Sequence, residues 1–325
     1  MTSVLCLRPK VDFSRVDALP PPSLSVRYHS PNDPEVPDLL RQSAALVIPA
    51  VGPKLAPVMF EDAGLKLIQV TGAGLDRLDM AAMNRLGIPV ANVPGGSNSA
   101  LAEYTLTAAS ILLRRFLWAN GEIKRGKYQA LRARLVADNL AGINGLLIGI
   151  VGLGTIGLAV AKAFAQAGCR ICYHDPVPAD PAAAQSIAAE ALSLDALLAR
   201  ADVVTLHVPL LPATTGLIGA AQLEMMKEGA VLIQASRGGV VDEAALAQSL
   251  RCGHLGGAAV DVYSTEPPPA DNPLIMLNGE AAQRLLLTPH IAGITRQSWA
   301  FLFRTAWENV ERVIVKGAPP LYRAN

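Results

Sequence analysis

The sequence predicts an α/β protein built from two doubly wound parallel sheets. Three observations carry this prediction: short apolar runs alternate with helical segments, the pattern changes after Gly96, and the chain is 325 residues long. Such a length exceeds one ordinary hydrophobic core and favours two domains. Apolar residues make up 51% of the chain and charged residues only 17%, which indicates a tightly packed protein rather than a disordered one.

The first series of elements occupies the N-terminal hundred residues. Short apolar runs predict strands at 4–7, 24–28, 45–49, 65–70 and 88–93. The intervening segments 37–43 and 79–86 have helix-period apolar spacing, and Gly87 is placed to end the second of them. This alternation is expected of a parallel sheet that is covered on both faces.

A long helical run at 101–117 leads into the second series. The charged stretch 122–138 has no core of its own, so we expect it on the surface or against another subunit. Six parallel strands are predicted at 146–151, 170–174, 203–207, 230–234, 257–262 and 284–288, with helices at 156–167, 194–201, 221–227 and 242–251. Ser193 and Asp242 are placed to cap two of these helices, and a last helix over 295–316 follows the sheet.

Charge, cysteine content and hydropathy exclude several classes of protein. Lys+Arg 28 against Asp+Glu 27 gives a net charge of +1, so no global field is available to hold nucleic acid or an anionic membrane. The 4 cysteines are too few for a disulfide framework and lack the spacing of a zinc site, which favours the reducing cytoplasm and no bound metal. The uncharged stretch 139–161 is long enough for a membrane span, but its glycines divide it into strand, turn and helix. The N-terminus has no pattern of a signal peptide.

A glycine-rich motif, G-x-G-x-x-G, lies between an apolar strand and an Ala-rich helix. In it, Gly152 permits the tight turn, Gly154 lets the backbone approach a pyrophosphate, and Gly157 lets the helix lie close to the strand. Asp175 follows at the end of the next strand, where a carboxylate can bind the adenosine ribose and would repel a 2′-phosphate. The sequence therefore predicts a Rossmann-type site for NAD in preference to NADP. The alternative is a glycine-rich turn of another α/β protein, with Asp175 as an ordinary turn residue.

Three further segments each follow a predicted strand at its C-terminal end, the edge at which open α/β sheets bind ligands. They read ASRGGVVDE from Ala235, AVDVYSTEP from Ala259 and TPHIAG from Thr288. Together with the turn GAGLD from Gly72, they make the chain resemble the D-isomer-specific 2-hydroxyacid dehydrogenase family. The resemblance runs from that turn to the final helix and is densest over 149–293.

The resemblance implies reversible hydride transfer between NAD(H) and a 2-oxo or 2-hydroxy acid. By motif match, His290 is the general acid and base, Glu266 its hydrogen-bonded partner, and Arg237 the residue that binds the substrate. These residue types suit the chemistry, because the developing alkoxide needs a proton and imidazole titrates near neutral pH. A guanidinium can also bridge carboxylate and carbonyl oxygens through its planar fork.

The resemblance further implies two Rossmann/flavodoxin-like domains with an active-site cleft between them. The substrate domain would comprise 1–100 plus 291–325, the NAD-binding domain would comprise 101–290, and a homodimer would form through the latter. Backbone amides of Ala73 and Gly74 would receive the substrate carboxylate. The further expected cofactor contacts are Thr155 and Ile156 in the glycine loop, Val208, Pro209 and Thr214 on the adenine side, and Ala235, Ser236, Arg237, Asp261, His290 and Gly293 around the nicotinamide and its ribose.

Other functions share these residues, and the sequence leaves them open. The same scaffold serves enzymes that act on formate, phosphite or phosphoglycerate, and related corepressors bind NAD(H) and act through protein partners. The lack of a long disordered tail or a basic patch counts against a corepressor. The substrate's side chain stays open, because specificity depends on the shape of a pocket that the sequence alone does not give. Segment 94–103 departs from the family's pattern, and His207 is expected to be structural. Arg296 and Trp299 are candidates for shaping the pocket, with a core position favoured for Trp299.

Overall fold

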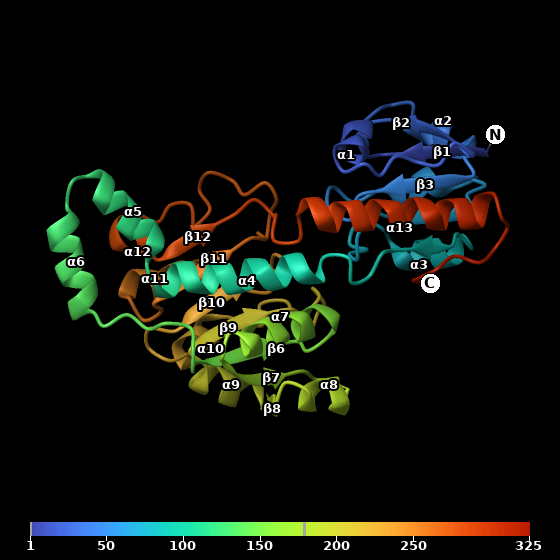
Figure 1. Ribbon diagram of the computed structural model, residues 1–325. Helices are drawn as coiled ribbons and strands as arrows, with labels where there is room; N and C mark the ends of the chain where they lie inside the picture. The colour runs from blue at the N-terminus through green and yellow to red at the C-terminus, as the bar shows by residue number, and fades with distance from the viewer. Residues whose placement is uncertain (1, 178–179) are drawn as a thin grey trace. The chain divides into compact units, whose positions relative to one another are not determined.

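The computed structural model describes residues 2–177 and 180–325 (Figure 1). The chain forms two compact units, one of Met1–Ser97 with Ile294–Asn325 and one of Asn98–Gly293. Each unit contains one parallel sheet with an apolar cluster on either face, which confirms the predicted α/β class. No helix in these described ranges has both the length and the apolar content needed to cross a bilayer.

The first unit has a five-stranded sheet in the order β2-β1-β3-β4-β5. Its strands are β1 (Thr2–Cys6), β2 (Leu24–Tyr28), β3 (Ala45–Ile48), β4 (Leu67–Val70) and β5 (Val90–Ala91). Its helices are α1 (Lys10–Arg15), α2 (Val36–Arg41), the 3-10 turn η1 (Pro57–Phe60), α3 (Met80–Arg85) and α13 (Arg296–Ile314).

Alternating side chains explain how this sheet is buried on both faces. In β1, Val4 and Cys6 pack into one apolar cluster and Leu5 into the other, because successive residues of a strand point to opposite sides. Helix α13 covers the first of these clusters with Phe303 and Trp307, whose ring centroids lie 4.7 and 5.1 Å from that of Phe13. The C-terminal helix thereby becomes part of the N-terminal unit.

The second unit has a seven-stranded sheet in the order β12-β11-β10-β9-β6-β7-β8. Its strands are β6 (Leu147–Val151), β7 (Arg170–His174), β8 (Glu190–Ala191), β9 (Val203–Leu206), β10 (Val231–Gln234), β11 (Gly257–Val260) and β12 (Leu285–Leu287). Its helices are α4 (Asn98–Leu113), α5 (Phe116–Lys124), α6 (Tyr128–Ala137), α7 (Thr155–Gln166), α8 (Pro181–Gln185), α9 (Leu194–Arg200), α10 (Ala220–Met225), α11 (Glu243–Cys252) and α12 (Gly279–Gln283).

The structure differs in three details from what the sequence predicted for residues 101–290. The sheet has a seventh strand, β8, whose two exposed residues pair with β7 and are too few to give an apolar pattern. The predicted helix at 101–117 is broken at Arg115, which adopts a left-handed φ of 50°, so that α5 starts in a new direction. The charged stretch 122–138, for which the sequence analysis gave no helix, is largely helical. Helix α5 buries no residue, and α6 buries only Leu131, so no periodic apolar stripe marks them.

Candidate active site

The glycine-rich loop joins β6 to α7. Gly152 has a φ of +91°, and a Cβ on Gly157 would lie 1.9 Å from the carbonyl oxygen of Gly152, so the turn and the helix pack too closely for a side chain. A Cβ on Gly154 would meet nothing within 4 Å, and Gly154 offers no side chain to cap the helix. The space beside Gly154 at the N-terminus of α7 is therefore open, and helix N-termini of this kind can bind an anion such as a pyrophosphate.

Asp175 braces this loop from the end of β7. Its Oδ2 accepts the amide proton of Leu153 at 2.8 Å, and its Oδ1 accepts that of Val177 at 2.9 Å. Each carboxylate oxygen can accept a second hydrogen bond, so both can still receive ribose hydroxyls. The expected contact with the adenosine ribose stays a prediction, and the loop is chemically suited to it.

The loop after β9 was expected to line the adenine side. Thr214 donates its hydroxyl to the carbonyl of Pro209 at 2.6 Å and accepts the amide proton of Leu211 at 2.8 Å, so this hydroxyl fixes the loop itself. Leu210 and Leu211 stay 41% and 52% exposed, which leaves apolar surface next to Val208 and Pro209. Apolar side chains of this kind suit the face of an adenine ring.

A small apolar cluster brings together three of the segments expected near the nicotinamide. Ile156 of α7, Ala235 after β10 and Ala292 after β12 pack with Leu101 and Tyr104 of α4. Ala235 and Ala292 are 9% and 4% exposed. The sequence places these segments far apart, and the parallel sheet brings them to one edge because every strand ends there.

Asp261, directly after β11, organises the turn that carries His290. Its backbone carbonyl accepts the amide proton of His290, and its carboxylate accepts those of Ile291 and Ala292, each at 2.8 Å. Thr288 adds its hydroxyl to the same carboxylate. Asp261 is only 1% exposed, so three successive amides and a hydroxyl converge on one buried residue. Its Oδ2 keeps one free lone pair, so the expected nicotinamide contact remains chemically possible.

His290 and Glu266 form the predicted pair. Nδ1 of His290 lies 2.8 Å from Oε2 of Glu266, and the side chains are 27% and 29% exposed. The other carboxylate oxygen of Glu266 accepts the amide proton of Tyr263 at 3.1 Å. His290 has a φ of 55°, a conformation that costs a non-glycine residue about 1 kcal/mol. The hydrogen bonds that Asp261 accepts from the backbone amides of His290, Ile291 and Ala292 hold it in this conformation.

Arg237 lies in a turn that packs against the Glu266 loop. The turn is fixed by Gln234, whose side-chain amide donates to the carbonyl of Arg237 at 2.8 Å, while Nη1 of Arg237 donates to the carbonyl of Ser236 at the same distance. A Cβ on the next residue, Gly238, would lie 1.8 Å from the carbonyl oxygen of Tyr263. The backbones after β10 and β11 are therefore in direct contact where the three motif segments meet.

Hydrogen bonds not anticipated from the sequence support this edge. The hydroxyl of Tyr104 lies 2.8 Å from Oγ1 of Thr288, and that of Tyr263 donates to the carbonyl of Thr288 at 3.0 Å. Burial raises the pKa of each tyrosine to about 12, so both stay protonated. No sequence signal pointed to Tyr104, because its partner lies 184 positions away.

His207, which follows β9, was expected to be structural. Desolvation lowers the pKa of His207 to about 4, which keeps this ring neutral and fits that expectation.

The expected residues of the first unit lie in two places, in the turn after β4 and in the first turns of α13. The turn with Ala73 and Gly74 follows β4, and Ala73 is exposed. Arg296 is exposed in the first turn of α13, whereas Trp299 packs on Phe303 with a centroid distance of 5.4 Å. Trp299 is thus partly buried against the apolar cluster of this unit rather than fully in its core.

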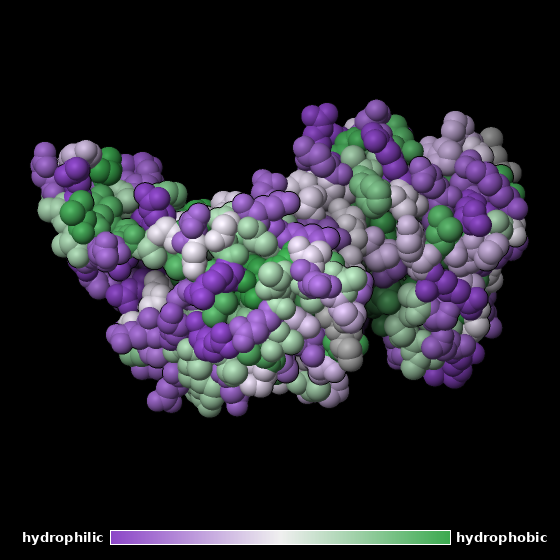
Figure 2. Space-filling view, turned by 60° about the horizontal axis from the view of Figure 1, so that its bottom comes forward, coloured by the Kyte–Doolittle hydropathy of each residue, from purple (hydrophilic) through white to green (hydrophobic). Residues whose placement is uncertain are grey.

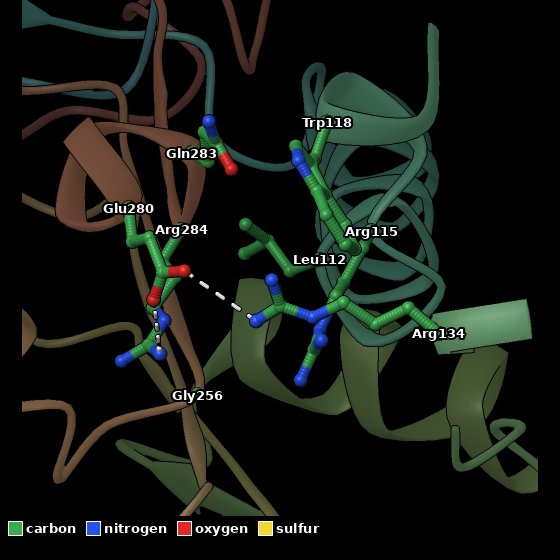
Figure 3. Close-up of a pocket in the computed structure, with 8 residues that line it drawn as sticks. All are labelled: Leu112, Arg115, Trp118, Arg134, Gly256, Glu280, Gln283 and Arg284. Carbon is green, nitrogen blue, oxygen red and sulfur yellow. Dashed lines mark hydrogen bonds and ion pairs between the residues drawn. The ribbon is translucent and has the colours of Figure 1, made fainter. Parts of the chain in front are cut away.

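Two cavities of the second unit lie away from this edge. One, of about 30 Å³, is lined by Leu112, Arg115, Trp118, Arg134, Gly256, Glu280, Gln283 and Arg284 (Figure 3). The other, of about 370 Å³, includes Cys252 and His254. Gly256, Gln283 and Arg284 of the first cavity precede β11 and β12, so it lies at the opposite end of these strands from His290, whereas the second cavity lies between α10 and α11. In Figure 3, Arg134 reaches Glu280, which also pairs with Arg284.

The chain is similar in sequence and in fold to known proteins. Residues 106–292 match the model of the D-isomer specific 2-hydroxyacid dehydrogenase, NAD binding domain. A D-3-phosphoglycerate dehydrogenase from Archaeoglobus fulgidus is 37% identical over 72% of this chain, which spans only 42% of that relative's length. A glyoxylate reductase from Thermofilum pendens is 33% identical over 96% of this chain and 94% of its own. The solved structure of a D-mandelate dehydrogenase from Rhodotorula graminis superimposes with a TM-score of 0.84 at 25% identity, covering 100% of this chain and 97% of the other.

Proposed function

Because the chain belongs to the D-isomer-specific 2-hydroxyacid dehydrogenase family, we propose that it interconverts a 2-oxo acid and a D-2-hydroxy acid with NAD(H). The hydrogen bond between His290 and Glu266 carries this proposal, because it joins an acid–base group to the partner that orients it. NAD(H) supplies or accepts the hydride when bound, and the open glycine loop at Gly154 is suited to hold its pyrophosphate.

The protein's own part in the reaction is to move one proton and to hold the acid. With Nδ1 of His290 bonded to the Glu266 carboxylate, Nε2 is the atom that exchanges a proton with the substrate oxygen. In reduction, the imidazolium gives its Nε2 proton to the developing alkoxide, and Glu266 stabilises the charged ring beforehand. In oxidation, neutral Nε2 accepts the hydroxyl proton.

We propose that one guanidinium group and two backbone amides bind the acid substrate. The guanidinium of Arg237 would bind the carboxylate and the carbonyl oxygen, as its planar fork allows. The backbone amides of Ala73 and Gly74 would receive the same carboxylate. These two residues belong to the proposed substrate domain, which comprises 1–100 plus 291–325. We also propose a cytoplasmic location, which is supported by four cysteines that are all free thiols.

We further propose a homodimer that forms through helices α5 and α6, here called the α5–α6 arm. These helices bury only Leu131, while Phe116, Leu117, Ile123, Tyr128 and Val136 are 45–68% exposed. Figure 2 shows apolar patches among polar ones at the end of the unit where the arm lies. Apolar side chains gathered on helices without a core suit a second copy of this chain.

The arm can be tested by sedimentation. A dimer is expected for the native chain, and a monomer for the double variant Phe116→Glu with Ile123→Glu. Met276→Glu is the matched control, because Met276 is equally exposed on the same unit but lies outside the arm. A native monomer, or a dimer that survives the double substitution, would contradict this interface.

The activity is tested by NADH oxidation with a panel of 2-oxo acids: glyoxylate, hydroxypyruvate, pyruvate, phenylpyruvate and a branched-chain analogue. We expect turnover with at least one acid and its loss, by at least about 10²-fold in kcat, in His290→Ala. NADPH, run in parallel, should be the poorer cofactor. NADH binding without turnover of any acid would oppose the proposed activity and favour a protein that binds NAD(H) for regulation.

A further inference from the structure

Arg77 is a buried cation in the first unit, at the C-terminal edge of its sheet. The residue is 2% exposed and lies in the loop that follows the Gly72–Gly74 turn. In the described part of the chain, the only acceptors recorded for its guanidinium are two backbone carbonyls. Nε donates to that of Pro53 at 2.9 Å and Nη1 to that of Pro49 at 3.3 Å, while buried Nη2 makes no hydrogen bond.

These contacts fasten one loop to another. The backbone carbonyl of Arg77 also accepts the amide proton of Leu55 at 2.9 Å, so this one residue holds the 49–55 segment at three points. A Cβ on Gly52 would lie 3.3 Å from the guanidinium carbon, so the segment wraps closely around the charge. We call residues 49–55 the β3 loop, because they follow β3.

The β3 loop in turn lies against the Gly72–Gly74 turn. A Cβ on Gly72 would approach that of Ala50 to 2.8 Å, and Thr71 donates its amide proton to the carbonyl of Ile48 at 2.8 Å. The position of the β3 loop therefore fixes one side of the turn. Val51, at 49% exposure, is the loop's outward-facing apolar side chain.

Stability does not account for the charge at position 77. Desolvation lowers the pKa of Arg77, and among residues 2–177 and 180–325 no carboxylate opposes this effect. A buried charge without a carboxylate partner costs folding free energy, and an apolar residue of similar length would avoid that cost. The charge is instead placed within one loop of the turn whose amides are proposed to receive an anion.

We propose that Arg77 is a positioning residue for the acid substrate: it clamps the β3 loop against the Gly72–Gly74 turn and adds a fixed positive charge that favours a carboxylate there. The proposal rests on the proposed function, because that function brings the carboxylate to this turn. In this proposal Arg77 contacts neither the substrate nor the cofactor. It acts through the position of the β3 loop and through its positive charge.

The test compares Arg77→Met and Arg77→Lys with Arg85→Met, an exposed arginine at the end of α3 in the same unit. Steady-state kinetics use the acid that the native enzyme reduces best, with saturating NADH. Arg77→Met should raise KM for the acid about 10-fold with kcat within about 3-fold, as expected when a charged group that acts equally in ground and transition states is lost. Arg77→Lys should recover part of this loss, because it keeps the charge but lacks the fork that spans two carbonyls.

Two measurements separate this proposal from a general defect and from failure of the proposed function. NADH affinity should be native in all three variants, since Arg77 and the glycine loop belong to different units. Hydrogen exchange of the β3 loop, without ligands, should be faster in Arg77→Met than in the native chain and in Arg85→Met. Native KM in Arg77→Met, or unchanged exchange in the β3 loop, would overturn the proposal. If the native enzyme binds NADH but reduces no acid, the proposed function fails and the substrate role falls with it, while the exchange result still decides the clamp.

Discussion

Replacing Asp261 by asparagine tests whether this buried carboxylate sets the turn that carries His290. The side chain accepts the amide protons of Ile291 and Ala292 at 2.8 Å each and the hydroxyl of Thr288. Asparagine keeps the size but turns one acceptor oxygen into an amide nitrogen, which faces a donor. One buried N–H then stays unpaired, at about 1–3 kcal/mol, and two bonds to a charged acceptor become neutral, at about 1 kcal/mol each. The free energy of unfolding should therefore fall by about 4 kcal/mol.

The assay combines urea unfolding, at one protein concentration, with NADH oxidation. Asp242→Asn is the matched control, because Asp242 also accepts two amide protons, from Ala244 and Ala245, but at a helix N-cap where asparagine serves about equally well. The control should lose less than about 0.5 kcal/mol. Asp261→Asn should also lose kcat, since the turn no longer holds His290 in its left-handed conformation. A variant within about 1 kcal/mol of native stability and with native kcat would refute this reasoning.

Three further predictions address the fold, the cofactor site and the acid–base pair. Burial lowers the pKa of His207 from 6.5 to about 4 in the folded state. Between these pH values mainly the unfolded state binds the proton, so the free energy of unfolding decreases as the pH is lowered. Urea unfolding at pH 6.5 and at pH 5 should show a loss of unfolding free energy about 1.5 kcal/mol larger for the native protein than for His207→Asn, and equal losses would contradict the lowered pKa of this ring. Gly154→Ala should weaken NADH binding at native stability, whereas Gly157→Ala should lower the melting temperature, because only a Cβ at position 157 meets backbone, at 1.9 Å. NADH titration and thermal melting measure the two effects. Weaker stability in Gly154→Ala together with a native melting temperature in Gly157→Ala would oppose the loop assignment. Glu266→Gln should lower kcat about 10²-fold at unchanged NADH affinity, and a native kcat would remove Glu266 from the reaction.

The sequence predicted the sheet of the second unit because its central strands are short apolar runs with turn residues at each end. β6, β9 and β10 are fully buried, and such strands leave a strong pattern. Many of the predicted site residues follow strands of this sheet, Arg237 after β10, Asp261 after β11 and His290 after β12, and parallel strands end at one edge. The pairing of His290 with Glu266 came from the motif resemblance, and its 2.8 Å geometry follows from the adjacent ends of β11 and β12.

Elements held by contacts distant in sequence were not predictable. The break at Arg115 depends on a single left-handed residue between two stretches that are both helical in composition. Strand β8 consists of two exposed residues and exists only because β7 offers a free edge. The buried state of Arg77 could not be foreseen either, since arginine in a polar turn is ordinarily exposed and its two carbonyl partners lie 24 and 28 positions earlier.

Asp261 shows that a sequence motif can identify a functional residue without revealing the structural role of its side chain. The resemblance assigned it a ligand contact, yet its carbonyl and carboxylate already receive the amides of His290, Ile291 and Ala292. A histidine that must exchange protons needs access to the substrate, and the side chain of His290 is 27% exposed. Its orientation is fixed by hydrogen bonds, from its backbone amide to Asp261 and from Nδ1 to Glu266. Asp261 accepts three successive amide protons, one at its backbone carbonyl and two at its carboxylate, and thereby restrains the backbone of His290. Glu266 bonds to Nδ1 and not to Nε2, so the atoms that hold the ring differ from the atom that exchanges the proton.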